Sequence, residues 1–170
     1  ELISDSVQDY VMATVAKERT IEFFEYRLIT NWAGVPVNID LRLGEVEENG
    51  DLQLIPLRSD GEGRRLDWSL EINATNGGLL EAVEGVRSIA PINGDYRRSW
   101  KIAFDRNAEK YLSSITKNLF FKTQNDVFVR LHINIHSDVR RPNVPSINIR
   151  AFVNESGGRV LDDGTTRSLY

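Results

Sequence analysis

Hydrophobic and polar residues alternate along much of the chain, which is the pattern of β-strands that bury one face. Successive side chains of a strand point to opposite sides of its sheet, so every second residue is apolar when one side is covered. The clearest alternating stretches are residues 35–46, 51–57, 66–73, 126–137 and 146–154, with a shorter one at 100–104. One covered face and one wet face are typical of antiparallel sheets, so we expect such sheets here.

Two places in the sequence refine this pattern. Residues 20–32 carry aromatic and β-branched residues on both faces, which favours a central strand that is covered on both sides. Further on, the pair Asn49-Gly50 separates two alternating runs. Asn-Gly accepts the positive φ angles of a tight turn, so it predicts a hairpin whose return strand is residues 51–57.

Three stretches carry apolar residues at helical spacing instead. They are residues 1–18, residues 79–90 and residues 108–115. In each stretch, apolar side chains recur three and four positions apart, which places them on one face of a helix. Pro91 follows the second stretch and is expected to end it, because proline lacks a backbone N–H. The sequence therefore predicts three short amphipathic helices.

These elements predict an α+β fold that is mainly β. The expected architecture is an antiparallel β-sandwich or curled sheet of about seven strands, with the three helices packed against it. No internal repeat or linker divides the 170 residues, so we expect a single domain over residues 1–170. Residues 155–170 contain three glycines and few apolar residues, which predicts a flexible C-terminal tail or arm.

Composition excludes several classes of protein. The hydrophobic fraction of 41% is enough for a packed core and too high for a disordered chain. The absence of cysteine excludes a disulfide framework, thiol chemistry and cysteine zinc sites, and it leaves the compartment open. No apolar run approaches the roughly 18 residues that a membrane-spanning helix needs. No signal-like stretch follows Glu1, so we expect an excised domain or a processed form.

The formal net charge of −4 conceals an uneven distribution along the chain. Residues 1–86 carry 7 basic and 17 acidic side chains, residues 87–122 carry 8 and 3, and residues 123–170 carry 6 and 5. The three segments therefore have net charges of −10, +5 and +1. Two outcomes stay open: the fold interleaves the segments, or the charges segregate and the molecule is dipolar. A dipolar subunit can bind a second copy head to tail.

Three pairs of adjacent arginines lie in expected loops or at expected strand starts: Arg64-Arg65, Arg97-Arg98 and Arg140-Arg141. Each guanidinium offers a planar fork of donors that suits phosphates and carboxylates. If the loops meet at one end of the sandwich, the pairs form a basic rim for RNA, lipid headgroups or an acidic surface of another copy. The alternative is three solvated pairs that point in different directions.

The last two alternating stretches predict a polar sheet face. If they pair, five residues lie side by side on its outer surface: Arg130, His132, Asn134, Asn148 and Arg150. Such planar donors and acceptors suit a nucleic acid, a carbohydrate or another protein, and the alternative is an ordinary solvated face. His136, the second histidine, is four strand positions from the first, a separation of about 13 Å that disfavours a shared metal ion.

The sequence carries no linear signature of catalysis, since the nucleophile elbow, the phosphate-binding loop and the HExxH zinc motif are all absent. We therefore predict no enzyme activity, no cofactor and no metal. The leading expectation is a structural or assembly protein that self-associates through complementary acidic and basic surfaces. A coat, matrix or scaffold subunit, for example of a virus, has this character. The alternative is a recognition module that binds an anionic or polar ligand on the exposed face of its C-terminal strands.

Overall fold

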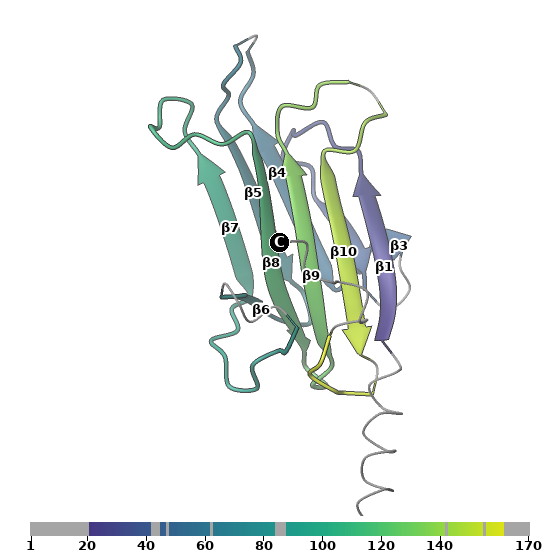
Figure 1. Ribbon diagram of the computed structural model, residues 1–170. Coiled ribbons are helices and arrows are strands. Elements are labelled where there is room, and N and C mark those ends of the chain that lie inside the picture. The colour runs from purple at the N-terminus through teal and green to yellow at the C-terminus, as the bar shows by residue number, and fades with distance from the viewer. Residues whose placement is uncertain are drawn as a thin grey trace, which may run out of the picture.

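The computed structural model describes residues 21–161, apart from 42–44, 47, 62, 84–87, 142 and 155. Within this part of the chain, ten strands form two antiparallel sheets that face each other (Figure 1). Sheet A contains, in order, β1 (Ile21–Leu28), β10 (Ile147–Asn154), β9 (Phe128–His136), β8 (Ser114–Thr123) and β6 (Gly77–Glu81). Sheet B contains, in order, β3 (Glu45–Val46), β2 (Val37–Asp40), β4 (Leu52–Arg58), β5 (Trp68–Ala74) and β7 (Ser99–Phe104).

The core between the two sheets follows the alternation in the sequence. Leu131, Ile133 and Ile135 of β9 are fully buried, whereas His132 and Asn134 between them are half-buried. The centre of the core on the side of sheet B consists of Leu52, Leu54, Leu70 and Ile72. Burial of each such side chain contributes about 1.5–3 kcal/mol. The mainly-β, sandwich-like part of the prediction is therefore confirmed.

The prediction of three helices packed against the sheets is wrong, because the described residues contain no helix. The stretch 79–90 begins as part of strand β6. Leu79 packs in the main core, and the next residue, Leu80, packs against a second apolar cluster on the other side of sheet A. A strand covered on both faces has consecutive apolar residues, and their spacing alone does not distinguish it from a short helix. The helix predicted at residues 1–18 lies outside the described residues.

The stretch 108–115 is also not a helix but a loop that leads into β8. The carboxylate of Asp105 accepts the backbone N–H of Asn107 at 2.7 Å, which forms a local turn that is not continued. The hydroxyl of Tyr111 donates to the carbonyl of Leu66 at 3.0 Å, so this side chain is used in a tertiary contact. These contacts take the place of the helical hydrogen bonds that the apolar spacing predicts.

Two of the expected strands are placed differently as well. Residues 20–32 provide the edge strand β1 and not a central strand, and Phe23 on its outer face is half exposed. The stretch 35–46 divides into β2 and β3, and β2 lies between β3 and β4. Asn49-Gly50 therefore joins strands that are not neighbours, although the return strand β4 does pair with β2. Gly50 is needed there because a Cβ atom would overlap the backbone of Ile39.

A second apolar cluster lies on the outer face of sheet A. Its buried members are Ala90, Phe120, Phe128 and Leu161. The segment before β7 and the segment after β10 cover it together, because Ile89 and Val160 form a β-bridge. The N–H of Leu161 also donates to the carbonyl of Ser88 at 2.7 Å. Residues 156–161, the described part of the predicted C-terminal arm, therefore pack against the sheet.

Candidate functional site

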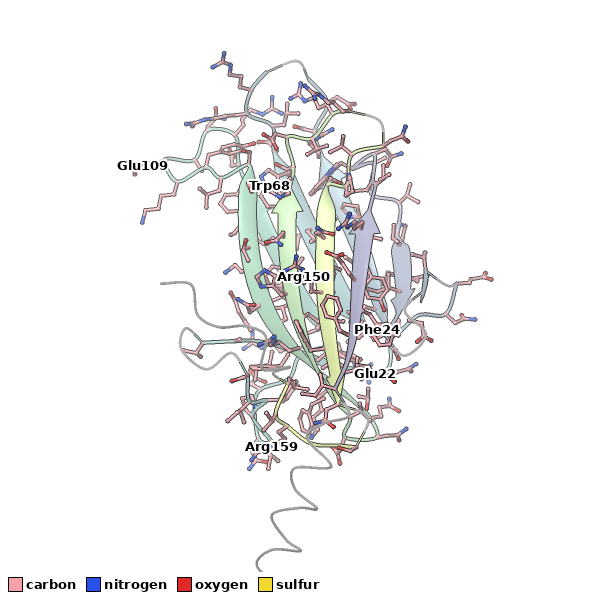
Figure 2. All side chains as sticks on the ribbon, turned by 45° about the vertical axis from the view of Figure 1, so that its right-hand side comes forward. Glu22, Phe24, Trp68, Glu109, Arg150 and Arg159 are labelled. Carbon is pink, nitrogen blue, oxygen red and sulfur yellow. The ribbon has the colours of Figure 1, made fainter. Side chains whose placement is uncertain are left out.

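The outer face of sheet A brings together the five polar residues that the sequence predicts to share a face. Strands β9 and β10 pair antiparallel, with Arg150 opposite His132 and Asn148 opposite Asn134. The fifth residue, Arg130, follows in the same outward register. Strands β9 and β10 therefore pair in the way that the shared face requires, and Figure 2 shows Arg150 near the middle of the sheet.

Most of these side chains already bond to neighbours within the face. Nδ1 of His132 lies 2.9 Å from a side-chain oxygen of β8, and Oδ1 of Asn134 accepts a hydroxyl of β8 at 2.7 Å. Nε of Arg150 donates to the carboxylate of Glu25 on β1 at 3.5 Å. Nδ1 of His136 lies 2.9 Å from another β8 hydroxyl. Side-chain hydrogen bonds thus join β9 to β8 and β10 to β1, which reduces the number of groups that the face offers to a ligand.

Arg130 is the most buried of the five residues. Only 7% of it is exposed, and its guanidinium carbon lies 4.1 Å from the ring centroid of Phe152. The Phe152 ring in turn packs against Phe23 at a centroid distance of 5.2 Å. Stacking of a guanidinium on an aromatic ring is favourable and fixes its orientation. Arg130 therefore serves the packing of this face, and little of it is accessible to a ligand.

The fold brings two of the three arginine pairs to the same end of the sandwich. Arg64-Arg65 lie in the β4–β5 loop and Arg140-Arg141 in the β9–β10 loop. Nη2 of Arg140 donates to the carbonyl of Gly63 at 2.7 Å, which ties the two loops together. Arg97-Arg98 lie at the other end, directly before β7, where Arg97 bonds to Asp95 at 2.8 Å. The basic rim that the sequence predicts therefore contains two pairs and not three.

Sequence reasoning missed Arg58, which lies between these loops. It is the last residue of β4, and its Nη1 donates to the carbonyls of Ser137 and Val139 in the β9–β10 loop. Burial, together with the charge of Arg140, lowers the pKa of the Arg58 guanidinium. The signal was present in the sequence, because Arg58 continues the inward register of β4 after Leu54 and is a charged residue at a position that faces the core.

Arg106 was missed as well, and it anchors the β7–β8 loop. Its guanidinium donates to the carboxylate of Asp67 at 2.8 and 3.0 Å and to the hydroxyl of Ser59 at 2.6 Å. These hydrogen bonds hold the pKa of Asp67 below its ordinary value. No spacing rule connects residues 39 positions apart, so this contact depends on the fold.

The two ends of the sandwich carry opposite net charge. We call residues 29–36, 58–68, 104–114 and 137–146 the arginine end. We call residues 21–22, 40–51, 75–76, 88–98, 122–127 and 156–161 the acidic end. Among the described side chains, the arginine end has seven basic and five acidic residues, and the acidic end has four basic and six acidic residues. Figure 2 shows Glu109 at the former end and Glu22 and Arg159 at the latter.

The acidic character is strongest around β2 and the start of β4. The side chain of Asp51 is buried and its Oδ2 accepts the backbone N–H of Leu41 at 3.2 Å. The hydroxyl of Tyr26 donates to the carbonyl of Asp40 at 2.7 Å. Burial and the charges of Asp40 and Asp51 raise the pKa of Tyr26, which records a negative potential at this place. Glu48 is exposed on the same end.

Two hollows lie at the arginine end. The larger, of about 440 Å³, has an apolar floor that includes Leu57, Trp68 and Phe104. The smaller, of about 160 Å³, is lined by Arg58 and Arg140 among others. Among the described residues, no three histidine, aspartate or glutamate side chains are grouped so that they would hold a metal ion. None of the described elements is a helix of the length and apolar character that crosses a membrane.

No family model, no curated protein and no solved structure matches this chain. The function must therefore be argued from the charges, contacts and hollows of the sandwich itself.

Proposed function

We propose that this domain is a non-enzymatic structural subunit that self-associates head to tail. The arginine end of one copy lies against the acidic end of the next. The observation that supports this proposal is the opposite sign of the net charge at the two ends of the sandwich, counted over the described side chains. Two different surfaces meet in such a contact, so repeated association closes into a ring or continues as a filament.

The exposed apolar side chains support the same arrangement. Charge pairs at a surface contribute only about 0–1 kcal/mol each, so a stable contact also needs apolar burial. Most of the large exposed apolar residues lie at the two ends. At the arginine end they are Ile29, Val35, Leu112 and Val144, with Leu57 next to it on β4, and toward the acidic end they are Val46, Ile89 and Ile92. The charges would then orient two copies, and these side chains would supply the buried area.

The alternative, a ligand on the outer face of sheet A, has less support. His132, Asn134 and Arg150 already bond to neighbouring strands, and Arg130 is stacked on Phe152, so only Asn148 has a side-chain oxygen without a hydrogen-bond partner. A ligand there would have to replace existing hydrogen bonds, which yields little net free energy.

The proposal is tested by the assembly state at two salt concentrations. At about 0.1 M NaCl the Debye length is about 10 Å, and at about 1 M it falls to about 3 Å, so an association oriented by charge weakens. We expect sedimentation velocity to show oligomers at the lower salt concentration and mainly monomers at the higher one. A monomer at both salt concentrations and at high protein concentration would contradict the proposal.

A pair of charge reversals identifies the surfaces. Arg64→Glu with Arg141→Glu changes two exposed arginines of the arginine end, and we expect it to weaken association by about tenfold or more. The matched control is Arg97→Glu with Arg98→Glu, which changes the net charge equally but at the acidic end. This control should leave association as strong as in the parent protein or stronger. Equal loss in both double variants would show that net charge, and not its placement, governs association.

A further inference from the structure

The smaller hollow at the arginine end has the features of an anion-binding pocket. It has a volume of about 160 Å³ and lies between the segment after β1, the β4–β5 loop and the β9–β10 loop. The side chains that matter for its chemistry are Trp32, Arg58, Ser59, Asp60 and Arg140. Three chain segments that are distant in sequence therefore supply polar groups to one small space.

Two guanidinium groups are held beside this space. Nη1 of Arg58 is fixed by the carbonyls of Ser137 and Val139, and Nη2 of Arg140 is fixed by the carbonyl of Gly63. An arginine has five N–H donors, so each guanidinium keeps further donors beyond these bonds. Burial, and after it the charge of Arg140, lowers the pKa of Arg58, while the charge of Asp138 raises it. Asp138 therefore offsets part of the repulsion between the two cations, and an anion between them would offset more of it.

Trp32 provides a second, independent observation at the same pocket. Its φ angle is 58°, in the left-handed region that is unfavourable for a bulky residue and costs about 1–3 kcal/mol. The loop holds this conformation through a hydrogen bond from the N–H of Arg58 to the Trp32 carbonyl, at 2.9 Å, and through the bridge between Ala33 and Leu57. The indole is 1% exposed, yet its Nε1 has no hydrogen-bond partner.

A strained backbone beside a pocket that two guanidinium groups line points to binding. We propose that the pocket binds a single oxyanion, a phosphate or a carboxylate, between Arg58 and Arg140. Planar guanidinium donors match both groups, because each presents two oxygen atoms to one arginine. Asp60, which also lines the pocket, is negatively charged, which favours a single small anion over a polyanion. All these groups belong to one copy of the chain, so the proposal does not depend on self-association.

The test uses dilute protein at low ionic strength and inorganic phosphate as the probe. Calorimetry gives the affinity, and the indole N–H signals in a ¹H–¹⁵N correlation spectrum give the location, since the chain has three tryptophans. We expect saturable one-to-one binding that shifts the Trp32 signal most. Arg140→Gln should weaken binding by about tenfold or more, because it removes a charged donor.

Arg141→Gln is the matched control, because it removes the same charge from the same loop but does not line the pocket. It should leave the phosphate affinity within about twofold of the parent protein. Equal weakening by both variants, or equal effects of phosphate and chloride at the same ionic strength, would overturn the proposal. So would the absence of saturable binding. An unchanged urea midpoint of Arg140→Gln shows that a loss of binding is not a loss of fold.

A second titration, with acetate, distinguishes a carboxylate ligand from a phosphate ligand. Acetate that binds more tightly than phosphate, with a binding that Arg140→Gln removes, identifies a carboxylate as the preferred ligand, as an acidic side chain of another protein would supply. Binding of phosphate alone identifies a phosphate. Either result supports an oxyanion site, and neither depends on whether the charge reversals at Arg64 and Arg141 change the assembly state.

Discussion

The two ends of the sandwich hold their loops in different ways. At the arginine end, charged side chains connect the loops: Arg58 and Arg140 donate to loop carbonyls, and Arg106 binds Asp67. At the acidic end, the crossing segments pair through backbone hydrogen bonds around the Ile89–Val160 bridge and pack on an apolar cluster. Partly buried charged side chains therefore join the loops at one end, whereas backbone pairing and apolar burial join the crossing segments at the other.

This difference suggests that the acidic end contributes more to the stability of the fold and the arginine end more to binding. Apolar burial is favourable without a partner, whereas charged donors that are only partly used retain the capacity to bind another group. The arginine end is therefore where a ligand or a second copy has the most to gain. The same difference predicts that the two ends respond differently to truncation and to pH.

The largest effect is expected from Phe120→Ala in the apolar cluster. Phe120 is fully buried beside Phe128 and Leu161, and its truncation removes a large buried surface and leaves a cavity. We expect a loss of about 3–5 kcal/mol in the free energy of unfolding, measured by urea denaturation.

Leu112→Ala at the arginine end is the comparison for this variant. Leu112 is about half exposed, so its truncation removes little buried surface and should cost less than about 0.5 kcal/mol. A small loss for Phe120→Ala, similar to that of Leu112→Ala, would show that the outer cluster does not stabilise the fold.

The sequence predicts the half-buried strands of this fold well and the strands covered on both faces poorly. In β5, and in the parts of β9 and β10 nearer the arginine end, the period of two is visible because one face is only partly covered. In β6, Leu79 and Leu80 are both apolar because the main core covers one face and the outer cluster covers the other. The period disappears in such a strand, and the residues resemble a helix. The sequence alone did not reveal that a second apolar cluster covers the outer face of sheet A, and the helix prediction failed there for that reason.

The candidate sites were predicted to a similar, partial extent. The shared face of Arg130 and Arg150 follows from strand alternation and one correct pairing. The proximity of Arg140 and Arg58 does not follow from strand alternation, because it depends on which loops lie at the same end of the sandwich. The net charges of the three sequence segments do not predict which charged residues share an end of the sandwich either. Both ends combine segments from distant parts of the sequence, and only the folded arrangement gives the ends their net signs.

An intermediate effect is expected from Arg58→Met at the arginine end. This change keeps an apolar stem of similar length but removes the donor to the carbonyls of Ser137 and Val139. Carbonyls that lose a charged donor cost about 1–2 kcal/mol, and amide hydrogen exchange in the β9–β10 loop should accelerate.

Arg159→Met is the matched variant at the acidic end. Arg159 also donates to a loop carbonyl, that of Ala90, at 3.3 Å. There the backbone hydrogen bond from the Ala90 N–H to the Arg159 carbonyl remains, so we expect a loss below about 0.5 kcal/mol. Equal losses for the two arginine variants would remove the distinction between the ends.

The smallest effect is expected from acid, and at the arginine end it arises from Asp67. Hydrogen bonds from Arg106 lower the pKa of Asp67 from its ordinary value of 3.8. A carboxyl group whose pKa is lower in the folded state stabilises the fold above the ordinary value, and this contribution is lost as the pH falls through the lower, folded value. The effect is small because solvent screens this exposed pair.

Asp67→Asn isolates this contribution, because asparagine keeps the shape of the side chain but does not titrate. The difference in urea midpoint between the parent protein and Asp67→Asn should be largest near pH 7 and should shrink below pH 3.8. At the acidic end, burial raises the pKa of Tyr96 to about 12, and its hydroxyl donates to the carbonyl of Pro91 at 2.8 Å. That tyrosine stays neutral throughout the acid range, so the cost of Phe120→Ala should not change between pH 7 and pH 3. A difference for Asp67→Asn that is constant with pH would show that shape, and not charge, holds the β7–β8 loop at the arginine end.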